Sequence, residues 1–202
     1  MDEMIRFLTD RGNLPVEGSS SPQQQDYLRS LVTRTDARLV GEIGFNAGFS
    51  SLAFLSAGPD VHVVSFDIGC HDVVNHAKEF VDSNYPGRHE LILGDSTWSV
   101  PAYRAQHPET SFDIIFIDGG HDYEKVSEDI SNMRAFSHPG TSVVIDDLTP
   151  WLPWGEGPTR AWTEAISQGM LVPVEIFKDG QLVCDIEPPG ERSWALGRYC
   201  FD

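Results

Sequence analysis

Short, mainly apolar runs alternate with amphipathic segments along most of the chain. The apolar runs, typical of buried parallel strands, lie at 39–43, 61–66, 91–93, 112–117 and 142–145. Segments compatible with helices lie between and after them, at 49–58, 71–83, 97–107, 122–136 and 158–168. This alternation predicts a doubly wound α/β fold, with a mostly parallel sheet covered by helices on both faces.

The first 36 residues have a different pattern, which predicts helices separated by a loop at Gly18–Pro22. Ser21 followed by Pro22 is typical of a helix start, because serine caps the free N–H groups and proline suits the first helical position. We expect residues 1–36 to form an N-terminal helical cap, and residues 37–202 to form the main domain of a single globular protein. A homodimer contact through the first segment stays open.

The C-terminal part predicts a hairpin rather than another strand–helix unit. Apolar runs at 172–177 and 181–186 flank Asp179-Gly180, and Asp-Gly is a preferred pair for a two-residue hairpin turn. Together with the five earlier runs, this predicts a seven-stranded, Rossmann-like sheet that ends in an antiparallel hairpin.

Composition and charge narrow the classes of partner. The chain has 202 residues with 40% hydrophobic content, which suits one sizeable core. It carries 31 acidic and 14 basic residues, for a formal net charge of −17. Nucleic acids and anionic membranes are bound largely through Lys and Arg, so neither is an expected partner. A small neutral or cationic substrate fits this surface better.

The cysteines and the apolar runs bear on localisation. Cys70, Cys184 and Cys200 are widely spaced and form no CxxC pair, which fits a reducing compartment. No run approaches the ~18 apolar residues of a membrane span, and the first residues do not resemble a signal peptide. We therefore expect a cytoplasmic protein.

Acidic residues mark the ends of the five predicted parallel strands. They are Glu42, Asp67, Asp95, Asp118 and the pair Asp146-Asp147. Ligands of doubly wound sheets bind at the carboxyl ends of the strands, so these acids predict a site along one edge of the sheet.

The turn after the first strand and the acid after the second are typical of a nucleoside site. Gly44 and Gly48 allow a tight turn with positive φ, and Asn46 tolerates the same backbone conformation. Asp67 can accept hydrogen bonds from both hydroxyls of a ribose. An NAD enzyme could use the same acid, so the turn and Asp67 leave the cofactor open.

Two features favour S-adenosylmethionine over NAD. The turn GFNAGFS lacks the third glycine of the G-x-G-x-x-G pattern that cradles a diphosphate. After the third predicted strand, Asp95 and Ser96 could hydrogen-bond the amino group of adenine. The acidic lining also suits a ligand that carries an ammonium and a sulfonium.

The chain resembles the class I S-adenosylmethionine-dependent methyltransferases, specifically the catechol O-methyltransferase-like and small bacterial metal-dependent O-methyltransferases, including sugar- and antibiotic-tailoring enzymes. The resemblance covers about Ser21 to Phe177 and lies in SPQQQDYLRSLV, LVGEIGFNAGFSSLAFL, VVSFDIG, LILGDS, FDIIFIDGGHDYEKVSEDI and SVVIDDLTPW. It implies that the cofactor is held by Glu42, Gly44, Gly48, Asp67, Asp95 and Ser96. Ser50 is expected to join them at a helix N-terminus, where free N–H groups favour the cofactor carboxylate. Asn46 and Asp118 complete the predicted cofactor set.

Three of the acids also predict a metal site. Asp118 and the pair Asp146-Asp147 follow strands that are expected to be neighbours, and converging carboxylates repel one another unless a cation offsets their charge. Mg²⁺, or another hard divalent cation, suits such oxygen ligands. The resemblance implies the same three ligands, while capping and strand-end roles remain the structural alternative.

His121 is the candidate general base. It lies three residues after Asp118, at a position where the catechol-type relatives have a lysine, so the position carries over and the residue type does not. Histidine can accept a hydroxyl proton near neutral pH. Orienting an aspartate or capping a helix are its structural alternatives.

Five tryptophans divide into two groups. Trp151 and Trp154 lie in the loop after the acid pair, where they could contact the substrate or pack the loop against the body of the protein. Trp98, Trp162 and Trp194 are expected to be core or packing residues.

The resulting hypothesis is an O-methyltransferase that acts on a hydroxyl of a small molecule such as a catechol, a sugar or another natural-product diol, with a metal positioning the acceptor oxygen. The alternatives are a metal-independent N- or O-methyltransferase and a non-catalytic cofactor-binding protein of the same fold. An NAD-dependent oxidoreductase is disfavoured by the missing glycine.

Overall fold

The residues described by the computed structural model, 2–13 and 20–201, form seven helices and eight strands. They divide between two compact units, residues 1–95 and 96–202. The predicted loop at Gly18–Pro22 lies partly outside the described residues. Within the described residues, no helix combines the length and the apolar character needed to cross a membrane.

The first unit is built from three parallel strands and four helices. In chain order they are α1 (Asp2–Thr9), α2 (Pro22–Thr35), β1 (Leu39–Ile43), α3 (Phe49–Ser56), β2 (His62–Asp67), α4 (Asp72–Asn84) and β3 (His89–Leu93). Strand β2 lies between β1 and β3 and is parallel to both. The carboxyl ends of these strands therefore lie at one edge, where Ile43 is opposite Phe66 and Asp67 is opposite Leu93.

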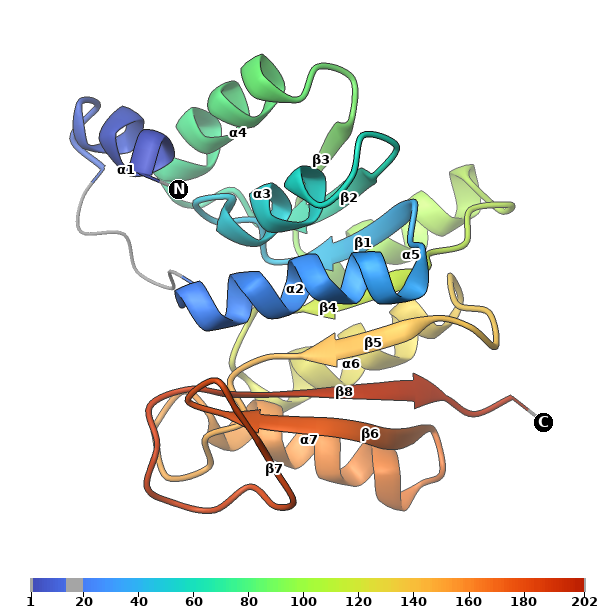
Figure 1. The fold of residues 1–202 in the computed structure, drawn as a ribbon. Coiled ribbons are helices and arrows are strands. Elements are labelled where there is room, and N and C mark those ends of the chain that lie inside the picture. Colours follow the sequence, from blue (N-terminus) through green and yellow to red (C-terminus); the bar gives the residue numbers. More distant parts are fainter. Residues whose placement is uncertain (1, 14–19, 202) are drawn as a thin grey trace. The chain divides into compact units, whose positions relative to one another are not determined.

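The N-terminal helices pack onto this unit rather than standing apart from it. Helix α1 lies beside α4 and α2 beside α3 (Figure 1). Met4 and Leu8 of α1 are fully buried, as their helical spacing predicts. The predicted start of α2 is confirmed, because the Ser21 hydroxyl accepts a hydrogen bond from the backbone N–H of Gln24 at 3.1 Å.

The second unit contains the remaining helices and strands. They are α5 (Ser96–Gln106), β4 (Ile114–Ile117), α6 (Tyr123–Arg134), β5 (Ser142–Ile145), α7 (Glu156–Ser167), β6 (Leu171–Lys178), β7 (Gln181–Val183) and β8 (Ser193–Tyr199). Strands β4 and β5 are parallel, and every residue of both is buried, as their apolar sequences predict. The α/β class is confirmed.

The C-terminal hairpin is confirmed, but it is not the last strand pair. Asp179 and Gly180 both have positive φ, as a turn with the favoured twist requires, and β6 and β7 pair antiparallel around them. An eighth strand, β8, was not predicted, and it lies between β5 and β6 and is antiparallel to both (Figure 1). The expected number of seven strands was therefore too low by one.

Packing around β8 accounts for two of the three expected core tryptophans. Trp162 and Trp194 are buried, and a Cβ at Gly197 would lie only 2.8 Å from the ring of Trp162 and 3.0 Å from the carbonyl oxygen of Val172. Only glycine therefore lets α7 pack this closely on β8. The expectation for Trp98 was wrong: its side chain is 60% exposed, because it lies on the outer side of α5.

Candidate functional site

The turn between β1 and α3 has the backbone conformation that its sequence predicts. Gly44, Asn46 and Gly48 have φ values of 93°, 43° and 74°. A Cβ at Gly48 would also lie 3.0 Å from the ring of Phe45. The turn therefore depends on glycine for both its backbone angle and its space.

Asp67, at the end of β2, organises this turn. Its Oδ2 accepts hydrogen bonds from the backbone N–H groups of Phe45 at 2.9 Å and Asn46 at 2.8 Å, and its Oδ1 accepts one from Gly69 at 2.7 Å. A carboxylate has about four acceptor positions, so one remains for a ligand hydroxyl. The residue predicted to bind ribose thus also shapes the loop beside it.

Two exposed apolar side chains flank Asp67, and the sequence analysis did not single them out. Ile68 is 58% exposed and Leu93, the strand partner of Asp67, is 52% exposed. A Cβ at Gly69 would approach Leu93 to 3.1 Å, so glycine leaves this surface open. The available signal was a large apolar residue at the end of each strand, since Ile68 directly follows Asp67 and Leu93 is the last residue of β3. Together they offer a flat apolar surface beside a hydrogen-bonding carboxylate.

Glu42 lies in the interior of the first unit. Its Oε2 accepts hydrogen bonds from the hydroxyls of Ser51 and Ser65, the latter at 2.5 Å, and its side chain is fully buried. Burial raises the pKa of Glu42, while the hydroxyls of Ser50, Ser51 and Ser65 oppose this effect. Its Oε1 has no hydrogen-bond partner among the described residues. The predicted cofactor residue Glu42 is therefore held by the hydroxyls of Ser51 and Ser65 beneath the turn.

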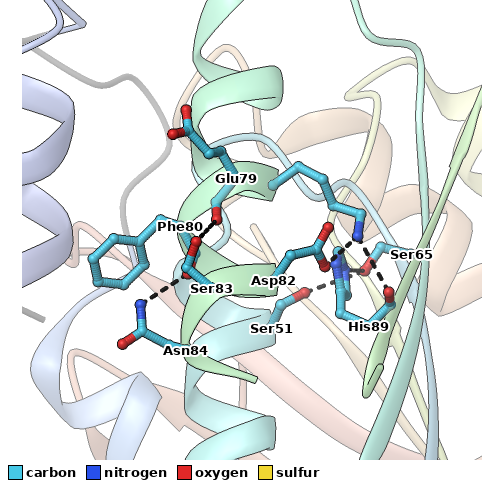
Figure 2. Close-up of polar contacts among 9 residues, drawn as sticks. Ser51, Ser65, Glu79, Phe80, Asp82, Ser83, Asn84 and His89 are labelled. Atoms are coloured by element: carbon cyan, nitrogen blue, oxygen red, sulfur yellow. Dashed lines mark hydrogen bonds and ion pairs between the residues drawn. The ribbon is translucent and has the colours of Figure 1, made fainter. Parts of the chain in front are cut away.

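A second hydrogen bond extends this network to β3. The hydroxyl of Ser65 lies 2.9 Å from Nε2 of His89, and Figure 2 shows Ser65 between Ser51 and His89. Burial, followed by the charge of Lys78, lowers the pKa of His89 to about 3, so its ring is neutral at ordinary pH.

Two further predicted cofactor residues lie where the two units meet in the sequence. Asp95 closes the first unit and Ser96 begins the second as the first residue of α5. Both side chains are partly exposed.

The second unit brings four predicted residues together. Asp118 and His121 follow β4, Asp146 and Asp147 follow β5, and all four line one pocket. Glycines and apolar residues complete its lining: Ile117, Gly119, Gly120, Val126, Ile145 and Pro158. The parallel pairing of β4 and β5 explains this arrangement, because it places the carboxyl ends of both strands at one edge.

His121 and Asp147 form a hydrogen-bonded pair within this pocket. The distance from Nε2 of His121 to Oδ2 of Asp147 is 2.9 Å, and the side chain of His121 is half exposed. The hydrogen bond to Asp147 raises the pKa of His121, whereas partial burial lowers it. Asp147 has a φ of 59°, and its N–H donates to Oδ1 of Asp146 at 2.8 Å. A histidine that is oriented by a carboxylate can accept a proton from a bound hydroxyl.

The same pocket is where the metal site was predicted. Among residues 2–13 and 20–201, no three His, Cys, Asp or Glu side chains are arranged to hold a metal ion. Asp118, Asp146 and Asp147 share the pocket, but one carboxylate oxygen of Asp147 is engaged by His121. The side chains present therefore do not fit a preformed metal site.

The two loop tryptophans have different environments. Nε1 of Trp151 donates to the carbonyl oxygen of Gly190 at 2.7 Å and so ties the loop after β5 to the segment before β8. Trp154 is 44% exposed. Beyond them, Gly157 at the start of α7 is packed so closely that a Cβ would lie 2.1 Å from the carbonyl oxygen of His121.

A comparison with known protein families decides which family this chain belongs to. A family model described as a methyltransferase domain matches residues 42–148, which is more than half of the chain. The chain belongs to this methyltransferase family. The matched region includes the turn after β1, Asp67 and the whole His121–Asp147 pair, and it confirms the resemblance seen in the sequence.

Solved structures of methyltransferases share the fold of this one. An O-methyltransferase from Bacillus cereus, in complex with SAH, is 21% identical, with 98% of this chain and 90% of that chain covered and a TM-score of 0.75. TomG from Streptomyces achromogenes, an O-methyltransferase of tomaymycin synthesis in complex with SAM, is 18% identical, with 98% and 88% covered and a TM-score of 0.75. The TDP-rhamnose 3'-O-methyltransferase CalS11 is 18% identical, with 96% and 92% covered and a TM-score of 0.63. No curated protein sequence matches this methyltransferase.

Proposed function

We propose that this methyltransferase transfers the methyl group of S-adenosylmethionine to a hydroxyl oxygen of a small molecule. The observation that carries the proposal is the His121–Asp147 pair, which lines a pocket at the carboxyl ends of β4 and β5 in a methyltransferase domain. The solved relatives, which include O-methyltransferases in complex with SAH and with SAM, support the cofactor and the acceptor atom.

The first unit has the chemistry to hold the cofactor. The remaining acceptor position of Asp67 suits a ribose hydroxyl, and the exposed side chains of Ile68 and Leu93 suit the apolar face of adenine. The turn from Gly44 to Gly48 leads into the N-terminus of α3, where free backbone N–H groups favour the methionine carboxylate. We propose that Asp95 and Ser96 contact the amino group of adenine.

The proposed chemistry is direct displacement. The cofactor supplies a methyl group already activated on a sulfonium, which the acceptor oxygen takes in line with the leaving sulfur. Oδ2 of Asp147 accepts the Nε2–H of His121 and holds the ring, so Nδ1 accepts the acceptor's hydroxyl proton. The exposed Trp154 offers an aromatic surface on the loop after Asp147 for a flat acceptor.

The acceptor class follows from charge and from the named relatives. The net charge of −17 favours a neutral or cationic molecule. TomG acts in tomaymycin synthesis and CalS11 acts on TDP-rhamnose, and on this basis we propose a natural-product acceptor for this chain as well.

A metal-dependent form of the same reaction is the second candidate. Three carboxylates, from Asp118, Asp146 and Asp147, line one pocket, and such a cluster is stabilised by a cation. In this form Asp118, Asp146 and Asp147 would hold Mg²⁺, and the ion would supply the positive charge that acidifies the acceptor hydroxyl.

One experiment tests the proposal and separates the two forms. Transfer of labelled methyl from S-adenosylmethionine is measured with catechol, a neutral diol, as the acceptor probe, with Mg²⁺ or with a chelator. His121→Asn should lower turnover about 100-fold or more, as expected for loss of a general base, with SAH affinity unchanged. His138→Asn is the matched control, because His138 lies in the same unit but pairs with Asp113 outside the pocket, at 3.5 Å.

The possible results of this experiment distinguish the metal-independent form from the metal-dependent form. Turnover that persists in chelator and falls in His121→Asn supports the metal-independent base. Turnover that stops in chelator and returns with Mg²⁺ supports the metal-dependent form. Methylation at nitrogen, or SAH binding without any transfer, would contradict the O-methyltransferase proposal.

A further inference from the structure

A chain of buried hydrogen bonds connects the three strands of the first unit beneath the turn after β1. His89 of β3 lies 2.9 Å from Ser65 of β2, whose hydroxyl lies 2.5 Å from the carboxylate of Glu42 on β1. All three side chains are nearly or fully inaccessible to solvent. Lys78 and Asp82 of α4 form a separate ion pair next to His89, and the ammonium group of Lys78 also donates to the carbonyl oxygen of His89.

The proton positions in this chain follow from the acceptors present. The hydroxyl of Ser65 has one proton, which it donates to Oε2 of Glu42. Its contact with His89 therefore requires that Nε2 carries a proton and donates it to Ser65. Because burial keeps this ring neutral, the donor is the Nε2–H tautomer of an uncharged imidazole.

His89 also contacts the turn directly. Its ring stacks on the ring of Phe45, with centroids 4.8 Å apart and an angle of 27° between the planes. The backbone N–H of Phe45 and that of the next residue are the two donors to Oδ2 of Asp67. The Phe45 ring also lies close to Gly48, 3.0 Å from the position that a Cβ would occupy there. A shift of this ring would therefore move the N–H groups that orient Asp67.

We propose that His89 is a positioning residue for the cofactor: through Ser65 and Glu42 on one side and Phe45 on the other, it holds the Gly44–Gly48 turn in its binding conformation. The inference rests on the proposed use of S-adenosylmethionine. His89 itself lies beneath the turn and touches no ligand in this role. Its contribution comes from its Nε2–H donor first and from its ring face second.

The test is calorimetric binding of SAH to the full chain, well below the melting temperature. His89→Phe keeps a ring against Phe45 but removes the donor to Ser65, and we expect a dissociation constant about 10-fold higher, the equivalent of one lost hydrogen bond. His89→Gln replaces the ring with an amide whose N–H can reach Ser65, and it should restore affinity to within about 3-fold of wild type. His62→Gln, at an exposed histidine of the same unit, is the matched control and should bind as wild type.

A second variant keeps the test decisive if His89→Phe does not fold. Ser65→Ala removes the hydroxyl that links His89 to Glu42 and changes fewer atoms than His89→Phe. It should weaken SAH binding about as much as His89→Phe. If His89 and Ser65 act through the same series of hydrogen bonds, the double variant should bind SAH no more weakly than the single variant with the lower SAH affinity.

Different SAH-binding results would refute the role of His89 and the proposed cofactor. Wild-type protein that does not bind SAH would refute the cofactor. Wild-type protein that binds SAH, together with His89→Phe and Ser65→Ala variants that bind equally well but melt at lower temperature, would show a purely structural role and overturn the inference.

Discussion

The buried, neutral His89 should make the stability of the protein depend on pH. An exposed histidine has a pKa near 6.5, whereas burial lowers the pKa of His89 to about 3 in the folded state. Between these values the unfolded chain binds a proton that the folded chain does not. The contribution is therefore fully present above pH ~6.5, and it is lost progressively as the pH falls towards 3.

The magnitude follows from the two pKa values. Each pH unit between them is equivalent to about 1.4 kcal/mol, and the effect begins near the pKa of the unfolded state. From pH 7 to pH 5, His89 should lower the free energy of unfolding by about 2 kcal/mol. Glu42 and His121 have raised pKa values and act in the opposite direction, so a difference between two variants is needed to isolate His89.

The assay is urea unfolding of the wild type and of His89→Gln at pH 7 and pH 5. Glutamine does not titrate, so the variant keeps every other pH-dependent group and lacks this one. All five tryptophans lie in the second unit, and circular dichroism is therefore preferred to tryptophan fluorescence for detecting the first. The wild type should lose about 2 kcal/mol more than the variant between the two pH values. Equal losses would refute the reasoning.

Two further predictions concern the two units separately. Gly157→Ala should lower stability by about 2 kcal/mol, because its Cβ would lie 2.1 Å from the carbonyl oxygen of His121, whereas Gly58→Ala, with its nearest contact at 3.4 Å, should be nearly neutral. Equal melting temperatures for the two variants would contradict this packing. Asp67→Ala should weaken SAH binding by at least 10-fold, since it removes the acceptor of two N–H groups in the turn as well as the proposed ribose contact, and unchanged calorimetric affinity would remove Asp67 from the site.

Much of the fold was predictable because local rules determine it. The strands at Leu39–Ile43 and Ser142–Ile145 have the predicted bounds, since a short apolar run between polar segments is stable only when it is buried. The start of α2 at Ser21 and the turn at Asp179-Gly180 depend on residues that are neighbours in the sequence. The convergence of Asp118, Asp146 and His121 on one pocket also followed from the sequence, because parallel strands place their carboxyl ends together.

Only the tertiary structure decided the features that depend on distant partners. Strand β8 was missed because its residues, SWALGRY, do not alternate, and its position depends on pairing with β5 and β6, two strands that do not directly precede it in the chain. Trp98 has the composition of a core residue, but the orientation of its helix exposes it. The burial of His89 depends on Ser65 and Phe45, each more than 20 residues away, and no local pattern distinguishes it from the exposed His62. The sequence by itself determined which segments form helices and strands and which strands end in an acid. The tertiary structure decided which side chains are buried, paired or exposed to a ligand, because burial depends on contacts between distant segments.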